Sequence, residues 1–168
     1  MRIRKEEATN ACKFLNAKPL FLDLDKPKLE VNEESINKTI EILRTEKPDI
    51  VFSPPCYDAH PTHRRLNQIM RKAIKSSQVE QIWFYETWTL IEKPNFIFFF
   101  DEDLMKIKVE AMKKHESQVE RLDFINAIKS LDRLRGIMGQ ELIGGFAKSY
   151  HSTKKYGEAF KIESHLTN

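Results

Sequence analysis

The sequence lacks the features that mark exported, membrane-embedded and disulfide-rich proteins. Its first residues, MRIRKEEATNAC, contain no apolar signal-peptide segment. Its longest apolar run, FIFFF, is far shorter than the roughly 18 residues that a membrane-spanning helix needs. The 2 cysteines, Cys12 and Cys56, are too few for a disulfide framework or a cysteine-based zinc site. These absences favour a cytoplasmic protein without a membrane span.

A strong charge of one sign is also missing. The 28 Lys and Arg residues are nearly balanced by 25 Asp and Glu residues, and the net charge of +3 is a weak signal for nucleic acid. The densest basic segment, KSYHSTKK, has no ladder of aromatic residues on which bases could stack. A nucleic-acid partner is therefore not expected. With 168 residues, 40% of them hydrophobic, and no internal repeat, the chain is predicted to be a single domain over residues 1–168.

What the sequence does contain is an alternation of helical apolar stripes and short apolar runs. Apolar spacing predicts helices over residues 4–17, 66–74 and 104–112, one from 124 toward 136, and one over 32–46 that the side chain of Asn32 could cap. Continuous apolar runs predict strands over 19–24, 49–53, 81–86 and 95–100. This order predicts an α/β layer structure whose mostly parallel sheet is covered on both faces.

The beginning of this pattern is unusual. Folds of this kind normally open with a strand, from which the first crossover helix departs. This chain opens directly with an amphipathic helix. We therefore expect the first strand of the fold to be missing from the chain.

The segment YDAHPTHRR, residues 57–65, is the candidate site. It follows the strand predicted over 49–53, at the edge of the sheet where α/β proteins bind ligands. Pro61 suits the first position of a helix, which places His60 at the cap and His63 on the first turn. Neutral imidazoles are common zinc ligands, but a catalytic zinc usually has about three protein ligands. Either Asp58, His60 and His63 all bind a metal, a ligand comes from elsewhere, or the segment is a solvated helix start.

Several segments resemble one known family. PDIVFSPPCYDAHPTHRR is similar to the second motif of the LmbE/PIG-L family of zinc-dependent N-acetylglucosaminide deacetylases. RKEEATNACKFL resembles the family's R-x-x-E-A-x-x-A helix, FFDEDLMKIKVEAMKKHESQ resembles its K-x-x-A-x-x-x-H-x-S-Q segment, and KKYGEAF resembles its Y-A-E-x-F ending. The segments occur in family order and cover nearly all of the chain.

The resemblance implies a Rossmann-like three-layer sandwich and hydrolysis of the N-acetyl group of an N-acetylglucosamine conjugate. It implies that His63 is a zinc ligand and that His60 stabilises the oxyanion of the tetrahedral intermediate. Asp58 would orient one of these histidines. Arg4 and Tyr156 would contact the substrate; the alternatives are an arginine at the helix surface and a surface tyrosine.

The chain departs from the family in its first motif. The family's A-H-P-D-D-E segment, which supplies two zinc ligands and the general base, is absent. The Zn²⁺ site is therefore predicted to be incomplete, and this chain alone is expected to be inactive. Thr62 also replaces the aspartate of many members, which affects the tuning of His60. A misassigned start, a split or decayed gene and a non-catalytic remnant all remain open as explanations.

The resemblance also defines the expected partners. The substrate would be an N-acetylglucosamine-containing small molecule or glycolipid, whose aglycone the sequence does not identify. A homo-oligomer or a separate N-terminal fragment would be a protein partner. The alternative function is a non-catalytic module that binds a glycoconjugate or another protein and derives from the same fold.

Overall fold

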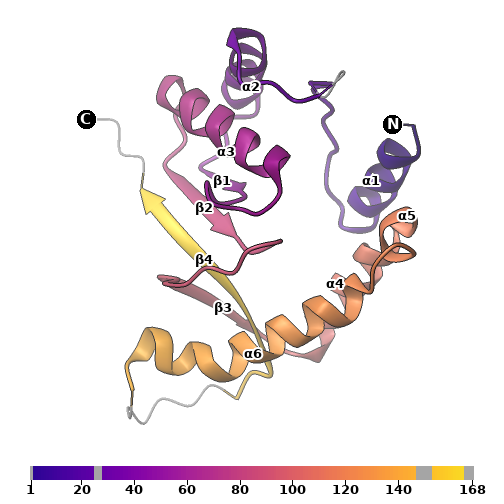
Figure 1. Cartoon of the computed structure of the whole chain (residues 1–168), viewed down its shortest axis with the longest axis vertical. Helices are drawn as coiled ribbons and strands as arrows, with labels where there is room; N and C mark the ends of the chain where they lie inside the picture. Colours follow the sequence, from indigo (N-terminus) through magenta and orange to yellow (C-terminus); the bar gives the residue numbers. More distant parts are fainter. Residues whose placement is uncertain (1, 25–27, 147–152, 165–168) are drawn as a thin grey trace. The chain divides into compact units, whose positions relative to one another are not determined.

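The computed structural model describes residues 2–24, 28–146 and 153–164. Figure 1 shows the order of the helices and strands. The helices are α1 (Arg2–Phe14), α2 (Glu33–Glu46), α3 (Pro61–Ala73), the short 3-10 helix η1 (Ile74–Ser76), α4 (Glu102–Lys113), α5 (Glu116–Val119) and α6 (Phe124–Gly144). The strands are β1 (Ile50–Ser53), β2 (Gln81–Tyr85), β3 (Phe96–Phe100) and β4 (Tyr156–Ser164).

The strands form a mixed four-stranded sheet of order β1-β2-β4-β3. β1 runs parallel to β2, whereas β4 runs antiparallel to β2. The predicted α/β class is confirmed, but the prediction of a mostly parallel sheet is wrong. The reason is β4, a nine-residue strand that pairs antiparallel with β2. From the sequence, this segment is identified only by its resemblance to a family motif.

Two further sequence predictions are wrong. Residues 19–24 form no strand, and Leu20 and Phe21 are 40% and 44% exposed, because no described strand pairs with this segment. The sheet is also not covered on both faces at β1. Residues of this strand alternate between exposed and buried, and Phe52 is 54% exposed. β1 lies at one edge of the sheet, with its buried residues facing only one side.

The chain divides into two compact units. The first, called the α6 unit, consists of Met1–Phe21 and Ile97–Glu158; the second, called the α3 unit, consists of Leu22–Phe96 and Ala159–Asn168. Each unit therefore combines an earlier and a later segment of the chain. A single domain over residues 1–168 stays a prediction.

The core of the α3 unit positions the start of α3. Asn32 caps α2 as predicted: its Oδ1 accepts the N–H of Ser35 at 3.0 Å, and its own N–H donates to Ser35 Oγ at 3.1 Å. The apolar stripes of α2 and α3 then pack with the buried faces of β1 and β2. This core consists of Leu43, Val51, Ala73, Ile74, Val79, Ile82 and Phe84. Burial of each large apolar side chain stabilises the arrangement by about 1.5–3 kcal/mol.

In the α6 unit, a pair of glycines brings α6 close to β4. The helix predicted to run toward Gly136 continues to Gly144, so Gly136 lies inside it. A Cβ atom on Gly136 would lie 2.5 Å from the carbonyl oxygen of Lys155 and 2.8 Å from Cα of Tyr156. A Cβ atom on Gly157 would lie 3.1 Å from the backbone nitrogen of Gly136. The helix and the strand therefore meet backbone to backbone.

The variant Gly136→Ala is expected to lower the free energy of unfolding by about 1–3 kcal/mol, because the added methyl group meets backbone atoms that cannot move aside. Gly144→Ala is the matched control, since its Cβ would meet no atom of the described residues within 4 Å and alanine favours a helix by up to about 1 kcal/mol. Urea denaturation measures both. Equal effects of the two substitutions would contradict the close approach.

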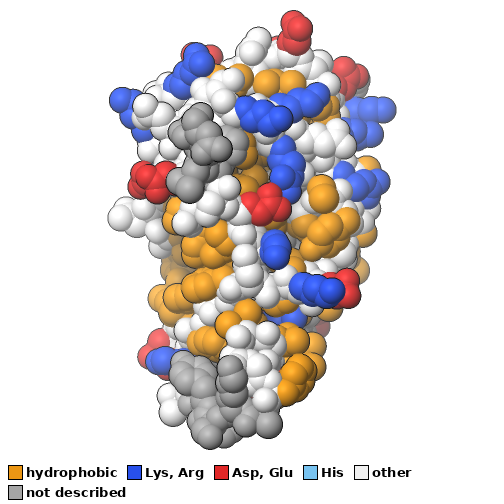
Figure 2. Space-filling view, turned by 90° about the vertical axis from the view of Figure 1, so that its left-hand side faces the viewer, with side chains coloured by type: hydrophobic (Ala, Val, Ile, Leu, Met, Phe, Trp, Pro, Cys, Tyr) orange, Lys and Arg blue, Asp and Glu red, His pale blue; other side chains and the backbone are white. Residues whose placement is uncertain are grey.

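The surface combines charged and apolar side chains. On the face shown in Figure 2, basic, acidic and apolar side chains are interspersed. Large apolar side chains such as Phe52 and Trp88 are about half exposed, at 54% and 46%. Among the described helices, none has the length and apolar character required to cross a membrane.

Candidate functional site

The candidate site begins where β1 ends and α3 starts. His60 is the N-cap residue of α3 and Pro61 occupies the first turn, as the sequence predicted. Nδ1 of His60 accepts the backbone N–H of Thr62 at 3.3 Å. Thr62 thus contacts His60 through its backbone, which any residue except proline could do.

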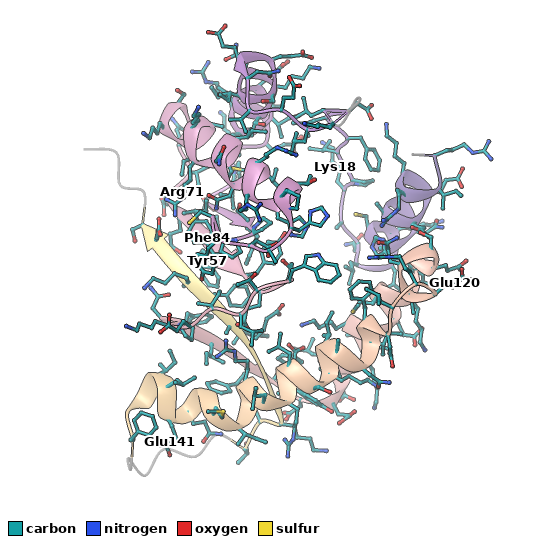
Figure 3. The ribbon with its side chains drawn as sticks, viewed as in Figure 1. Lys18, Tyr57, Arg71, Phe84, Glu120 and Glu141 are labelled. Atoms are coloured by element: carbon teal, nitrogen blue, oxygen red, sulfur yellow. The ribbon has the colours of Figure 1, made fainter. Side chains whose placement is uncertain are left out.

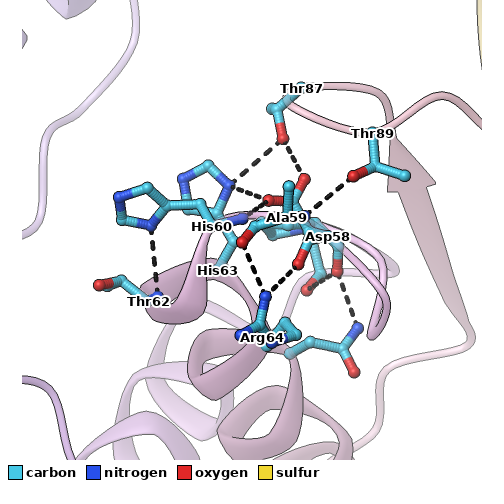
Figure 4. A network of polar contacts seen from close by, with 11 residues as sticks. Asp58, Ala59, His60, Thr62, His63, Arg64, Thr87 and Thr89 are labelled. Atoms are coloured by element: carbon cyan, nitrogen blue, oxygen red, sulfur yellow. Dashed lines mark hydrogen bonds and ion pairs between the residues drawn. The ribbon is translucent and has the colours of Figure 1, made fainter.

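The carboxylate of Asp58 is the centre of the site (Figure 4). Asp58 is fully buried. Its Oδ2 accepts the hydroxyl of Thr87 at 2.6 Å, and its Oδ1 accepts the backbone N–H of His60 at 2.8 Å. Nδ1 of His63 lies 3.2 Å from the same Oδ1. One carboxylate therefore holds both histidine-bearing positions.

The environment keeps Asp58 ionised. Burial by itself raises the pKa of this carboxyl group. The hydrogen bonds from Thr87 and from the backbone of His60, together with the nearby His63 and the backbone of Trp88, outweigh burial and hold the pKa below its ordinary value. An ionised carboxylate only accepts hydrogen bonds, so the proton of a neutral His63 ring lies on Nδ1.

The hydrogen-bond partners give the two imidazoles complementary chemistry. Nδ1 of His63 forms a hydrogen bond with Oγ1 of Thr87 at 3.2 Å and lies 3.2 Å from Oδ1 of Asp58; a proton on Nδ1 leaves a lone pair on Nε2. His60 uses Nδ1 as an acceptor, so in its neutral form Nε2 carries the proton and can donate it in a hydrogen bond. The ring centroids are 4.8 Å apart. Two neighbouring rings thus offer one metal-binding or basic nitrogen and one hydrogen-bond donor.

The loop that carries these residues is braced by the helix it precedes. Nη1 of Arg64 donates to the carbonyl oxygens of Asp58 and Ala59 at 2.7 and 2.8 Å. Nδ2 of the buried Asn67 donates to the carbonyl oxygen of Pro54 at 2.8 Å. These contacts fix the backbone on both sides of the carboxylate and reduce the reorganisation that ligand binding would require.

Sequence reasoning missed the threonines that complete the network. The hydroxyl of Thr87 contacts both Asp58 and His63, and Oγ1 of Thr89 accepts the N–H of Ala59 at 2.9 Å. Both threonines follow β2, the parallel neighbour of β1. Because the carboxyl ends of parallel neighbours lie at the same edge of a sheet, this topology could have pointed to them.

The described residues do not fit a catalytic zinc on their own. Within residues 2–24, 28–146 and 153–164, no group of three or more His, Cys, Asp or Glu side chains is arranged to hold a metal ion. The Asp58 carboxylate is engaged by Thr87 and by the backbone and ring of the two histidines. The two imidazoles alone fall short of the roughly three ligands of a catalytic zinc.

Arg4 and Tyr156 belong to the α6 unit, whereas Asp58 and the histidines belong to the α3 unit. Arg4 is exposed on α1. Hydrogen bonds from Ser117 lower the pKa of the nearby Glu7, and Arg4 adds to this effect. Oη of Tyr156 donates to Glu102 at 3.2 Å. Substrate contact by Arg4 and Tyr156 stays a prediction.

Comparisons with known proteins agree with the motifs. The family model "PIG-L: GlcNAc-PI de-N-acetylase" matches residues 1–74, which include the candidate loop. Diacetylchitobiose deacetylase of Thermococcus kodakarensis is 26% identical over 136 residues, which cover 68% of this chain and 49% of that protein. The resemblance to the PIG-L family is confirmed. This PIG-L-like chain spans about half the length of that curated relative.

Solved structures show how widely the fold of the PIG-L-like chain is used. N,N'-diacetylchitobiose deacetylase from Pyrococcus horikoshii matches with a TM-score of 0.67 and 25% identity, over 96% of this chain and 63% of that one. GalB, the 4-carboxy-2-hydroxymuconate hydratase of Pseudomonas putida, matches with a TM-score of 0.75 and 16% identity, over 99% and 74%. The GalB match shows the fold alone, and a fold does not select a reaction.

Proposed function

We propose that the chain is part of a hydrolase that removes the N-acetyl group from an N-acetylglucosamine conjugate, either a small molecule or a glycolipid. The PIG-L match and the deacetylase relatives support this assignment. The observation that carries it is the pair of complementary imidazoles held by the buried Asp58. A cytoplasmic location remains a prediction from the sequence.

Hydrolysis of an amide requires stabilisation of the negative charge that develops on the carbonyl oxygen. In the proposal, Nε2–H of His60 donates a hydrogen bond to that oxygen. Asp58 and Thr87 favour the His63 tautomer that leaves Nε2 free, so this nitrogen would be the metal ligand that the loop contributes. Zinc, when bound, polarises an amide carbonyl and lowers the pKa of its water to about 7.

Among the described residues, no group of three or more His, Cys, Asp or Glu side chains forms a metal site. We therefore propose that residues other than the described ones complete the metal site and supply the general base, and that the described residues do not turn over substrate without them. A second candidate function is a non-catalytic module that binds a glycoconjugate. It is favoured by the absence of a three-donor metal group in the described part of the chain.

Histidine side-chain NMR tests the proposal. N-acetylglucosamine is expected to shift the imidazole signals of His60 and His63, and glucosamine is expected to shift them less. In Asp58→Asn, the two sugars are expected to shift these signals equally. Zinc should strengthen sugar binding if the loop belongs to a hydrolase and leave it unchanged if the chain is only a binding module. No shift with either sugar would overturn both functions.

An acetate-release assay with zinc and N-acetylglucosamine completes the test. The isolated chain is expected to release no acetate above the uncatalysed rate. Zinc-stimulated release that His63→Ala abolishes would confirm the deacetylase and overturn the proposal that its site is incomplete.

A further inference from the structure

A pocket of about 520 Å³ lies in the α3 unit behind the candidate loop. Its volume is within the range of roughly 300–1,000 Å³ that is usual for small-molecule sites. Its charged lining residues are Arg71, Lys93, Lys161, Glu92 and Glu163, and its larger apolar and aromatic ones are Tyr57, Phe84, Leu90 and Ile91. None of them has a role in the proposed deacetylation.

The floor and one side of the pocket are fixed in place. Phe84 of β2 and Lys161 of β4 are direct partners in the antiparallel pairing. The guanidinium of Arg71 lies 4.8 Å over the Phe84 ring and donates to both carboxylate oxygens of Glu163, at 3.0 and 3.1 Å. Figure 3 shows Tyr57, Arg71 and Phe84 near one another. Arg71 and Glu163 neutralise each other, and the pair is held rigidly.

Lys161 differs from Arg71 because it has no such partner among the residues that the structure describes. It is half-buried, and no carboxylate of the residues placed in the structure forms an ion pair or hydrogen bond with its ammonium group. Lys93, exposed at the pocket, also lacks one among those residues. A partly desolvated ammonium that has no carboxylate partner is stabilised by an anion that enters from solution.

We infer that this pocket binds a small aromatic or cyclic carboxylate. Its flat apolar body lies between Tyr57 and the wall formed by Leu90 and Ile91, and its carboxylate contacts Lys161. The apolar walls favour a ring, and the single unpaired ammonium on the floor favours one compact negative charge. This inference does not depend on the chain being a deacetylase.

The pocket shares its wall with the candidate loop. Tyr57 directly precedes Asp58, and Thr89, which also lines the pocket, accepts the N–H of Ala59. A bound carboxylate therefore contacts the segment that positions His60. Occupancy of the pocket is expected to shift the backbone amide signal of Ala59.

Three probes separate the parts of the inference. 2-Naphthoate carries both a ring and a charge, 2-naphthamide carries the ring alone, and acetate carries the charge alone. Calorimetric titration is expected to show binding of naphthoate at least about tenfold tighter than that of the other two. In the Cys12→Ser background, naphthoate should also slow the alkylation of the exposed Cys56 at the pocket. Equal binding of naphthoate and naphthamide would overturn the anion site.

Substitutions locate the charge. Lys161→Gln is expected to weaken naphthoate binding about tenfold without changing naphthamide binding, and Lys161→Arg should retain naphthoate binding. Lys75→Gln, an equal change of charge at an exposed position outside the pocket, is the control. Equal losses in Lys161→Gln and Lys75→Gln would show only general electrostatic attraction and would overturn the inference. Unchanged binding in Lys161→Gln would also overturn it.

Discussion

Replacement of Asp58 by alanine is expected to lower the free energy of unfolding by about 2–4 kcal/mol. The fully buried carboxylate accepts the hydroxyl of Thr87 and the N–H of His60, and it lies beside Nδ1 of His63. Its removal leaves these donors without their acceptor and opens a polar cavity. Urea denaturation at pH 7 measures the loss.

Asp103→Ala is the control, because the Asp103 side chain is 93% exposed and its loss should change stability by less than about 0.5 kcal/mol. A loss at Asp58 no larger than this would contradict the central role of the carboxylate.

The contribution of Asp58 to the free energy of unfolding is expected to depend on pH. Because the folded-state pKa of Asp58 is lowered, its ionisation stabilises the protein above the unfolded pKa of about 3.9 and stops doing so as pH falls through the folded value. The stability difference between the natural chain and Asp58→Asn should therefore be full at pH 6 and shrink below about pH 4. A difference that stays constant would show that the charge of Asp58 is not what stabilises the loop.

Replacement of His63 by alanine is expected to weaken zinc binding at least about tenfold, whereas His60→Ala should change it by less than about threefold. The reason is the difference in ring tautomer: Asp58 leaves Nε2 of His63 free, whereas the bond from Thr62 N–H to Nδ1 of His60 leaves a proton on its Nε2. Competition with a chromogenic chelator measures the affinities.

Asp58→Asn should also weaken zinc binding, since loss of a carboxylate that orients a metal-binding histidine typically weakens binding about 10–100-fold. Equal losses in the two histidine variants would show that both rings hold the metal. Full affinity in both variants would place the zinc elsewhere.

The features that the sequence predicted well depend on contacts between residues only a few positions apart in the chain. Asn32 caps α2 through Ser35, three positions away, and His60 caps α3 through Thr62, two positions away. Such contacts depend on local residue types and on the conformational limits of a following proline. The pairing of Asp58 with His60 also lies within this range, so the centre of the candidate site could be anticipated.

The features that the sequence did not predict depend on distant partners. Residues 19–24 have the composition of a strand, but composition does not supply the neighbour that a strand needs. The sequence predicts no strand over Tyr156–Ser164, where KKYGEAF only resembles a family motif; this segment is a strand because it pairs with the distant β2. Thr87 contacts Asp58 across 29 positions, a relation that topology rather than periodicity defines.

The contacts of Arg64 couple the histidine loop to α3. Its side chain holds two carbonyl groups only five and six positions earlier, and Asn67 holds another thirteen positions earlier. The backbone around Asp58 is thus shaped largely by its own downstream helix. A shift in the position of α3 would therefore also move the carbonyl groups beside Asp58 and with them the backbone that carries both histidines.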